Sequence, residues 1–141
     1  MNYIILLALI LITIPAQAKE ILVGPIPAEL VSVRDGDTID VKARIWLGQT
    51  INVAVRINGI DTPELKGKCE AEIRLAHEAK VALGSLLNGG TIQLTDIQHG
   101  KYAERVLATV TVDKLNVADR LMELKLARPY TGGKRGSWCD K

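Results

Sequence analysis

Residues 38–46 read Thr-Ile-Asp-Val-Lys-Ala-Arg-Ile-Trp, and apolar and polar side chains alternate strictly along them. Such alternation is typical of a β-strand with one buried face. Residues 51–58 repeat the pattern, and Leu47-Gly48-Gln49 between the two segments is typical of a hairpin turn. This hairpin is expected to bury the apolar positions Ile39, Val41, Ala43, Ile45, Ile51, Val53, Val55 and Ile57.

Three further segments, residues 30–34, 91–95 and 105–112, have short strand-like patterns. Residues 69–87 are rich in Ala, Glu, Leu and Lys and predict a helix, and a second helix is expected to begin after Asn116 as its N-cap. The order βββ–α–ββ–α predicts a mainly β, α+β domain: a five-stranded Greek-key barrel of the OB type. The helix positions expected to face the barrel are Ala76, Ala79, Leu83, Leu86, Val117, Leu121 and Leu124.

The composition bounds the class of protein. A chain of 141 residues accommodates one domain, and an apolar content of 48% against 24% charged residues excludes a disordered chain. The sequence contains no Phe, so its core is expected to be aliphatic. The formal net charge of +2 argues neither for nor against a nucleic-acid partner.

The N-terminal segment is predicted to be a signal peptide, residues 1–18, followed by a domain over residues 19–141. Residues 4–14 form an apolar run of h-region length, and Ala16-Gln17-Ala18 is an A-x-A cleavage pattern. The stretch before the run carries no Lys or Arg, and an uncleaved anchor is the alternative. Cleavage predicts a periplasmic or secreted protein with no membrane attachment, and a monomer is the default expectation.

Export bears on the two cysteines of the chain. Cys69 and Cys139 would meet an oxidising compartment, where a pair is more often bonded than free. A Cys69–Cys139 disulfide is therefore expected, and two unpaired buried thiols are the alternative.

Three segments concentrate charge at the ends of expected strands. In the first, Asp35 and Asp37 flank Gly36, so both carboxylates can point into one space. The alternative is an ordinary turn, since turns favour Asp and Gly.

The second charged segment carries Arg56, Asp61 and Glu64 within nine residues. Aspartate oxygens hold hard divalent cations, a carboxylate can activate water, and arginine forks hold phosphate oxygens. A surface Arg–Glu pair is the alternative for this segment. Arg105 in the third segment is expected to approach the same anion from another strand, or to be a solvated strand-edge arginine.

These three segments, in this order, resemble the staphylococcal nuclease family over about residues 28–130. The resemblance implies an OB-fold endonuclease that acts on DNA and RNA, usually with Ca²⁺. It places Arg56, Glu64 and Arg105 at the catalytic positions. It also places Asp37, Asp61 and the carbonyl of Thr62 at the calcium site, with Asp35 as a nearby acid.

The chain departs from the family pattern at two places. The turn Tyr102-Ala103-Glu104-Arg105 is one residue longer than the family's Tyr-Gly-Arg turn. After Tyr130, a short tail containing Cys139 replaces the longer C-terminal helix of the founding member. We expect the Cys69–Cys139 bond to fasten this tail beside the start of the first helix.

The substrate is expected to be nucleic acid, read with little sequence specificity. Tyr102 and Tyr130 are candidates to stack on a base or bond a phosphate, and a tail-packing aromatic is the alternative for Tyr130. Four basic residues are expected to line the approach or, more often for such charges, to form a solvated face: Lys101, Arg128, Lys134 and Arg135.

The charge count favours a cation site. Four acids, Asp35, Asp37, Asp61 and Glu64, face two arginines, and a divalent ion would cancel this surplus. Ca²⁺ is the expected cofactor, with Mg²⁺ or another divalent cation as the alternative. The sequence thus predicts an exported, metal-dependent endonuclease acting on phosphodiester bonds of DNA, RNA or both. The alternatives are a non-catalytic OB-fold module that binds nucleic acid and a calcium-binding structural domain.

Overall fold

The structure is a computed structural model and describes residues 18–139. The expected signal peptide therefore lies, except for Ala18, outside the described residues. Within the described range no helix combines the length and the hydropathy needed to span a membrane.

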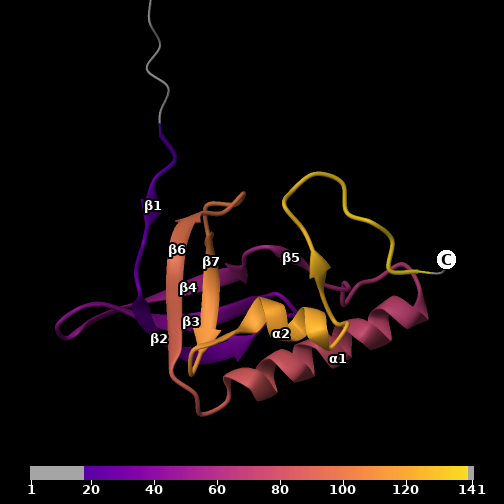
Figure 1. The fold of residues 1–141 in the computed structure, drawn as a ribbon, viewed down its shortest axis with the longest axis horizontal. Coiled ribbons are helices and arrows are strands. Elements are labelled where there is room, and N and C mark those ends of the chain that lie inside the picture. The colour runs from indigo at the N-terminus through magenta and orange to yellow at the C-terminus, as the bar shows by residue number, and fades with distance from the viewer. Residues whose placement is uncertain (1–17, 140–141) are drawn as a thin grey trace, which may run out of the picture.

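Five long strands close into a barrel (Figure 1). They pair in the order β6-β2-β3-β4-β7, and β6 also pairs with β7, which closes the barrel. The β4–β7 pair is parallel and the other four barrel pairs are antiparallel. This is the five-stranded OB-type barrel that the sequence predicts. The strands are β2 (Ile26–Val33), β3 (Thr38–Trp46), β4 (Gln49–Ile57), β6 (Ile92–His99) and β7 (Arg105–Val112).

Four two-residue strands supplement the barrel. The strand β1 (Ile21–Leu22) pairs with β6, and β8 (Leu115–Asn116) pairs with β7. A separate ladder joins β5 (Ile60–Asp61) to β9 (Arg128–Pro129). This ladder brings a segment near the C-terminus beside the residues that follow β4.

The two helices lie where the sequence predicts them. The long helix α1 (Glu70–Leu87) buries the expected Ala76, Ala79 and Leu83, and its last buried residue is Leu87 rather than Leu86. In the short helix α2 (Val117–Glu123), the N-cap Asn116 accepts a hydrogen bond from the backbone of Asp119. The expectation for Leu124 is wrong, because the helix ends before it and its side chain is exposed.

The core is aliphatic, as expected for a chain without Phe. Ile39, Val41 and Val55 are fully buried inside the barrel. Ile45 and Ile51 are exposed, contrary to expectation, because the end of the β3–β4 hairpin extends beyond the barrel (Figure 1).

Candidate active site

The loop between β2 and β3 holds Asp37 in a buried position. The backbone N–H of Asp37 donates to Asp35 Oδ1 at 3.0 Å, which closes the turn. A Cβ on Gly36 would lie 2.8 Å from the Cβ of Ala79 on α1 and 3.0 Å from the hydroxyl oxygen of Thr62. The glycine therefore lets this loop pack against α1 and Thr62, which an ordinary turn does not require.

Asp37 and Arg56 are paired inside the site. One guanidinium nitrogen of Arg56 lies 3.2 Å from Asp37 Oδ2 and also donates to the carbonyl of Ile60. The Thr38 hydroxyl donates to the other carboxylate oxygen at 2.8 Å. Burial raises the pKa of Asp37 to about 6; Asp35 adds to the rise, and Arg56 opposes it. The positive charge of Arg56 thus compensates the burial of this carboxylate only in part.

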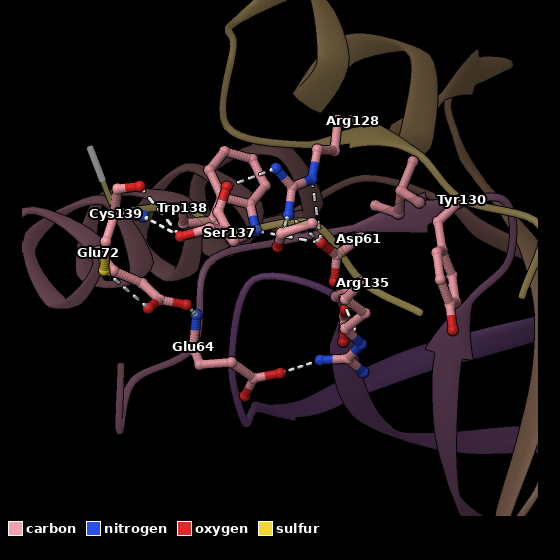
Figure 2. A network of polar contacts seen from close by, with 12 residues as sticks. Asp61, Glu64, Glu72, Arg128, Tyr130, Arg135, Ser137, Trp138 and Cys139 are labelled. Atoms are coloured by element: carbon pink, nitrogen blue, oxygen red, sulfur yellow. Dashed lines mark hydrogen bonds and ion pairs between the residues drawn. The ribbon is translucent and has the colours of Figure 1, made fainter. Parts of the chain in front are cut away.

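Asp61 is the most buried acid of the site, with 2% of its side chain exposed. Its Oδ2 accepts from Arg128 Nε at 3.2 Å, from Arg128 Nη2 at 3.0 Å and from Trp138 Nε1 at 3.0 Å (Figure 2). Its Oδ1 accepts no hydrogen bond from any residue between positions 18 and 139. One oxygen of this carboxylate therefore accepts three hydrogen bonds, and the other accepts none from the described residues.

Arg135 of the C-terminal tail joins two acids of the site. Its Nε lies 3.3 Å from Asp61 Oδ1, in an orientation that makes no hydrogen bond, and its Nη1 donates to Glu64 Oε1. Figure 2 shows the Arg135 side chain between the two carboxylates. The tail thus supplies a cation where the sequence led us to expect uncompensated acids.

The expected surplus of negative charge is therefore wrong as it was counted. Arg128 and Arg135 pair with Asp61 and Glu64, so four arginines rather than two are set against the four acids. The expectation that these two arginines form a solvated face is also wrong. Their partners lie more than sixty positions earlier in the chain, which no local pattern reveals.

Glu72 is a further acid of the site that sequence reasoning missed. Its buried carboxylate accepts from the backbone N–H groups of Glu64 at 3.3 Å and Lys68 at 2.9 Å, so it fixes the loop that carries Glu64. It stands three residues after the N-cap Cys69, where a glutamate commonly reaches back to free N–H groups. That position is the signal that points to it.

Arg56 and Arg105 line one pocket of about 940 Å³, together with Tyr102 and Tyr130. Arg105 begins β7 and pairs with Ala54 on the neighbouring β4, so the longer turn before it leaves its side chain at this pocket. Its guanidinium carbon lies 5.3 Å from the centroid of the Tyr102 ring.

Tyr130 lies between two arginines. The centroid of its ring is 5.8 Å from the guanidinium of Arg56 and 5.9 Å from that of Arg135, and its hydroxyl donates to the carbonyl of Gly133. The Tyr130 side chain therefore packs against the tail and also lines the pocket.

The Cys69–Cys139 disulfide is confirmed, with the two Cα atoms 6.0 Å apart, and the expectation of unpaired thiols is set aside. The bond fastens the tail at the N-cap of α1, as expected. Glu72 lies close to both sulfurs, but bonded sulfurs do not offer thiolates to a metal ion.

The chemistry of the acidic side chains suits a divalent cation. The candidate ligands Asp37, Asp61 and Thr62 are buried and offer only oxygen atoms, which hard cations prefer. Asp61 Oδ1 is buried and accepts no hydrogen bond within residues 18–139, although Arg135 lies beside it, and the raised pKa of Asp37 marks a carboxylate whose charge is only partly compensated. A cation held between these residues would compensate it.

A family model described as Staphylococcal nuclease homologue matches residues 54–137. The matched span is more than half of the chain and runs from β4 into the tail. Arg56, Asp61, Glu64 and Arg105 lie within it, and Asp37 precedes it. A search of curated proteins found no match.

Proposed function

The chain belongs to the staphylococcal nuclease family, and on this premise we propose that it is an exported, divalent-metal-dependent endonuclease acting on DNA, RNA or both. One observation carries the proposal: two arginines on adjacent strands, Arg56 and Arg105, line a single pocket, and Arg56 is paired with a buried acid of the candidate cation site. A phosphodiester is an anion, and this arrangement offers it positive charge and paired donors.

Asp37, Asp61 and the carbonyl of Thr62 would hold the cation, which would neutralise a non-bridging phosphate oxygen. Arg56 and Arg105 would donate hydrogen bonds that strengthen as charge develops on the phosphoryl oxygens. Glu64, with 53% of its side chain exposed, can reach water and would take a proton from the attacking molecule. These roles are the ones that the family resemblance implies. Arg135 supports them, because it contacts Asp61 and Glu64 and also lines the pocket of Arg56 and Arg105.

Aromatic side chains line the pocket and can contact the bases of a substrate. Tyr102 is exposed beside Arg105, and a tyrosine ring can stack on any base. Stacking of this kind favours single or fraying strands and little sequence preference. We propose a monomer, with nucleic acid as substrate.

Export to the periplasm or the medium is part of the proposal. The Cys69–Cys139 bond supports it, since disulfides persist in oxidising compartments.

One observation favours the alternative, a non-catalytic OB-fold module that binds nucleic acid. Arg128 and Arg135 already neutralise Asp61 and Glu64, so the fold does not require a cation there. A binding module would keep the basic pocket without hydrolysis.

A cleavage assay separates the two functions. The disulfide-bonded protein is incubated with single-stranded DNA and with RNA, each with Ca²⁺, with Mg²⁺ and with EDTA. We expect cleavage only with metal, and a loss of about 10²–10⁴-fold in rate for Glu64→Gln, a change at a side chain that is 53% exposed and outside the core. Arg56→Ala should lose about 10²-fold or more.

Arg44→Ala is the control, because Arg44 is exposed on β3 outside the pocket. Binding without cleavage under every metal supports the module. Cleavage that survives both Glu64→Gln and Arg56→Ala assigns the activity to another site or to a contaminant.

A further inference from the structure

We propose that Arg128 and Trp138 are positioning residues that lock the carboxylate of Asp61, holding Oδ2 and leaving Oδ1 as the oxygen that binds the cation. The inference deepens the proposed function, because it assigns the orientation of the cation site to the C-terminal tail. It concerns cation affinity, which is measured without any nucleic acid.

The backbone places Arg128 beside its partner. In the β5–β9 ladder Asp61 is the register partner of Arg128, so the two side chains leave neighbouring strands at the same level. Cross-strand pairs at this spacing interact directly. The arginine uses Nε and Nη2 on the same oxygen, Oδ2.

Trp138 is the second residue that fixes the Asp61 carboxylate. Its indole N–H donates to Oδ2 at 3.0 Å, so this oxygen accepts three hydrogen bonds. An oxygen with three N–H donors around it has no lone pair left for a metal ion. Oδ1 is buried and accepts no hydrogen bond within residues 18–139, and its neighbour is the guanidinium of Arg135 at 3.3 Å, so it is the oxygen that a cation would bind in place of Arg135.

Arg128 also organises the tail around itself. Its guanidinium carbon lies 4.2 Å from the centroid of the Trp138 ring, and two further N–H groups donate to the carbonyls of Gly136 and Ser137. Figure 2 shows the guanidinium beside the indole, with both directed at Asp61. The disulfide at Cys139 follows directly and fixes the end of this arrangement.

Turning the Asp61 carboxylate away from this orientation would break all three bonds to Oδ2, at a side chain that is 2% exposed. Partners of this kind that orient a ligand typically change metal affinity by 10–100-fold. Lysine cannot replace Arg128, because it lacks the planar fork, and phenylalanine replaces the indole of Trp138 with a smaller aromatic ring that has no N–H. Both substitutions therefore remove the hold.

The test is calorimetric titration of Ca²⁺ into the metal-free, disulfide-bonded protein. We expect the Kd to rise at least ~10-fold in Arg128→Lys and in Trp138→Phe. The matched controls are Arg120→Lys, at an exposed ion pair with Glu123, and Trp46→Phe, at an exposed tryptophan. Both controls should leave the Kd unchanged. Melting in EDTA identifies any variant that does not fold, and the other variant then decides.

A Kd that stays at the wild-type value in the folded variants overturns the inference, as does a wild-type protein that binds neither Ca²⁺ nor Mg²⁺. A further readout separates positioning from general damage: cleavage by the variants should recover when the Ca²⁺ concentration is raised. Weaker Ca²⁺ binding in the variants of a protein that cleaves nothing supports the inference and rejects the nuclease proposal. Cleavage by the wild type together with an unchanged Kd in the variants supports the nuclease proposal and rejects the inference.

Discussion

Arg135 Nε lies 3.3 Å from Asp61 Oδ1, the buried carboxylate oxygen that accepts no hydrogen bond within residues 18–139. The same guanidinium donates to Glu64 and packs against Tyr130. A divalent cation that uses Asp61 Oδ1 and a water molecule that uses Glu64 would both meet this side chain. Arg135 therefore stands as an internal counter-ion at the centre of the proposed chemistry.

Replacing Arg135 with glutamine should tighten Ca²⁺ binding, because the ion no longer displaces a guanidinium from two carboxylates. We expect a Kd lower by about tenfold, which corresponds to about 1.4 kcal/mol, measured by calorimetry. Lys134→Gln removes the adjacent positive charge and separates this contact from the general electrostatic effect. An unchanged or weaker affinity in Arg135→Gln alone would show that the arginine does not compete with the ion.

The stability of the metal-free protein should depend on pH through Asp37. Burial raises the pKa of this carboxyl from its ordinary 3.8 to about 6 in the folded state, so the folded protein holds the proton more tightly than the unfolded chain does. Stability from this group is therefore greatest below about pH 4 and falls as the pH rises to about 6, then levels off. Urea unfolding in EDTA across this range measures it.

Asp37→Asn should remove that part of the pH dependence, because the amide does not titrate. The comparison also isolates Asp37 from the other carboxyl groups of the protein. A wild-type profile parallel to that of Asp37→Asn between pH 4 and 6 would contradict the prediction.

Gly36→Ala should destabilise the protein and displace Asp37. The added Cβ would lie within 3.0 Å of Thr62 and closer still to Ala79, and overpacking of this kind costs about 1–3 kcal/mol. Gly84→Ala in α1 is the matched control, since its Cβ would make an ordinary contact of 3.8 Å with Val33 and alanine favours the helix. Denaturant unfolding should therefore give a lower free energy of unfolding for Gly36→Ala and a higher one for Gly84→Ala than for the wild type. Equal effects would mean that the loop relaxes around the new side chain.

Reduction of the disulfide should lower the free energy of unfolding by about 2–5 kcal/mol, since the bond joins residues 70 positions apart. Denaturant unfolding with and without a reductant measures the change, and a mass-spectrometric thiol count should give no free thiol before reduction. A Cys69→Ser/Cys139→Ser double variant should not respond to the reductant. A stability that the reductant leaves intact in the wild type would rule out this contribution.

The barrel was predictable because its strands are long enough to show the alternation of apolar and polar side chains. Residues 38–46 and 105–112 match β3 and β7 at both ends, since alternation over eight or nine residues is unambiguous. The two-residue β5–β9 ladder has no period, so the sequence could not reveal it. The burial of Ile45 was not predictable for a related reason. The alternation correctly places it in a strand, but whether its side chain is buried depends on where the barrel ends.

The candidate site was predictable where its residues lie at strand ends. Asp37 and Arg56 meet because Thr38 and Arg56 are register partners across β3 and β4. The contributions of Arg128 and Trp138 were not predictable, because β9 is two residues long and Trp138 lies outside any strand or helix, so neither carries a periodic signal. Their placement follows from a short ladder and a distant covalent bond, and both are tertiary features.

Every strand of the barrel and both helices are complete by residue 123, and the β5–β9 ladder by residue 129. Arg135 and Trp138 come later in the chain, and so does the sulfur that ties them down. The strands and helices of the barrel thus end before the residues that complete the pocket begin. The acidic centre therefore depends on tail residues that take no part in the pairing of the barrel strands, and removal of Trp138 would release Asp61 Oδ2 from its indole partner.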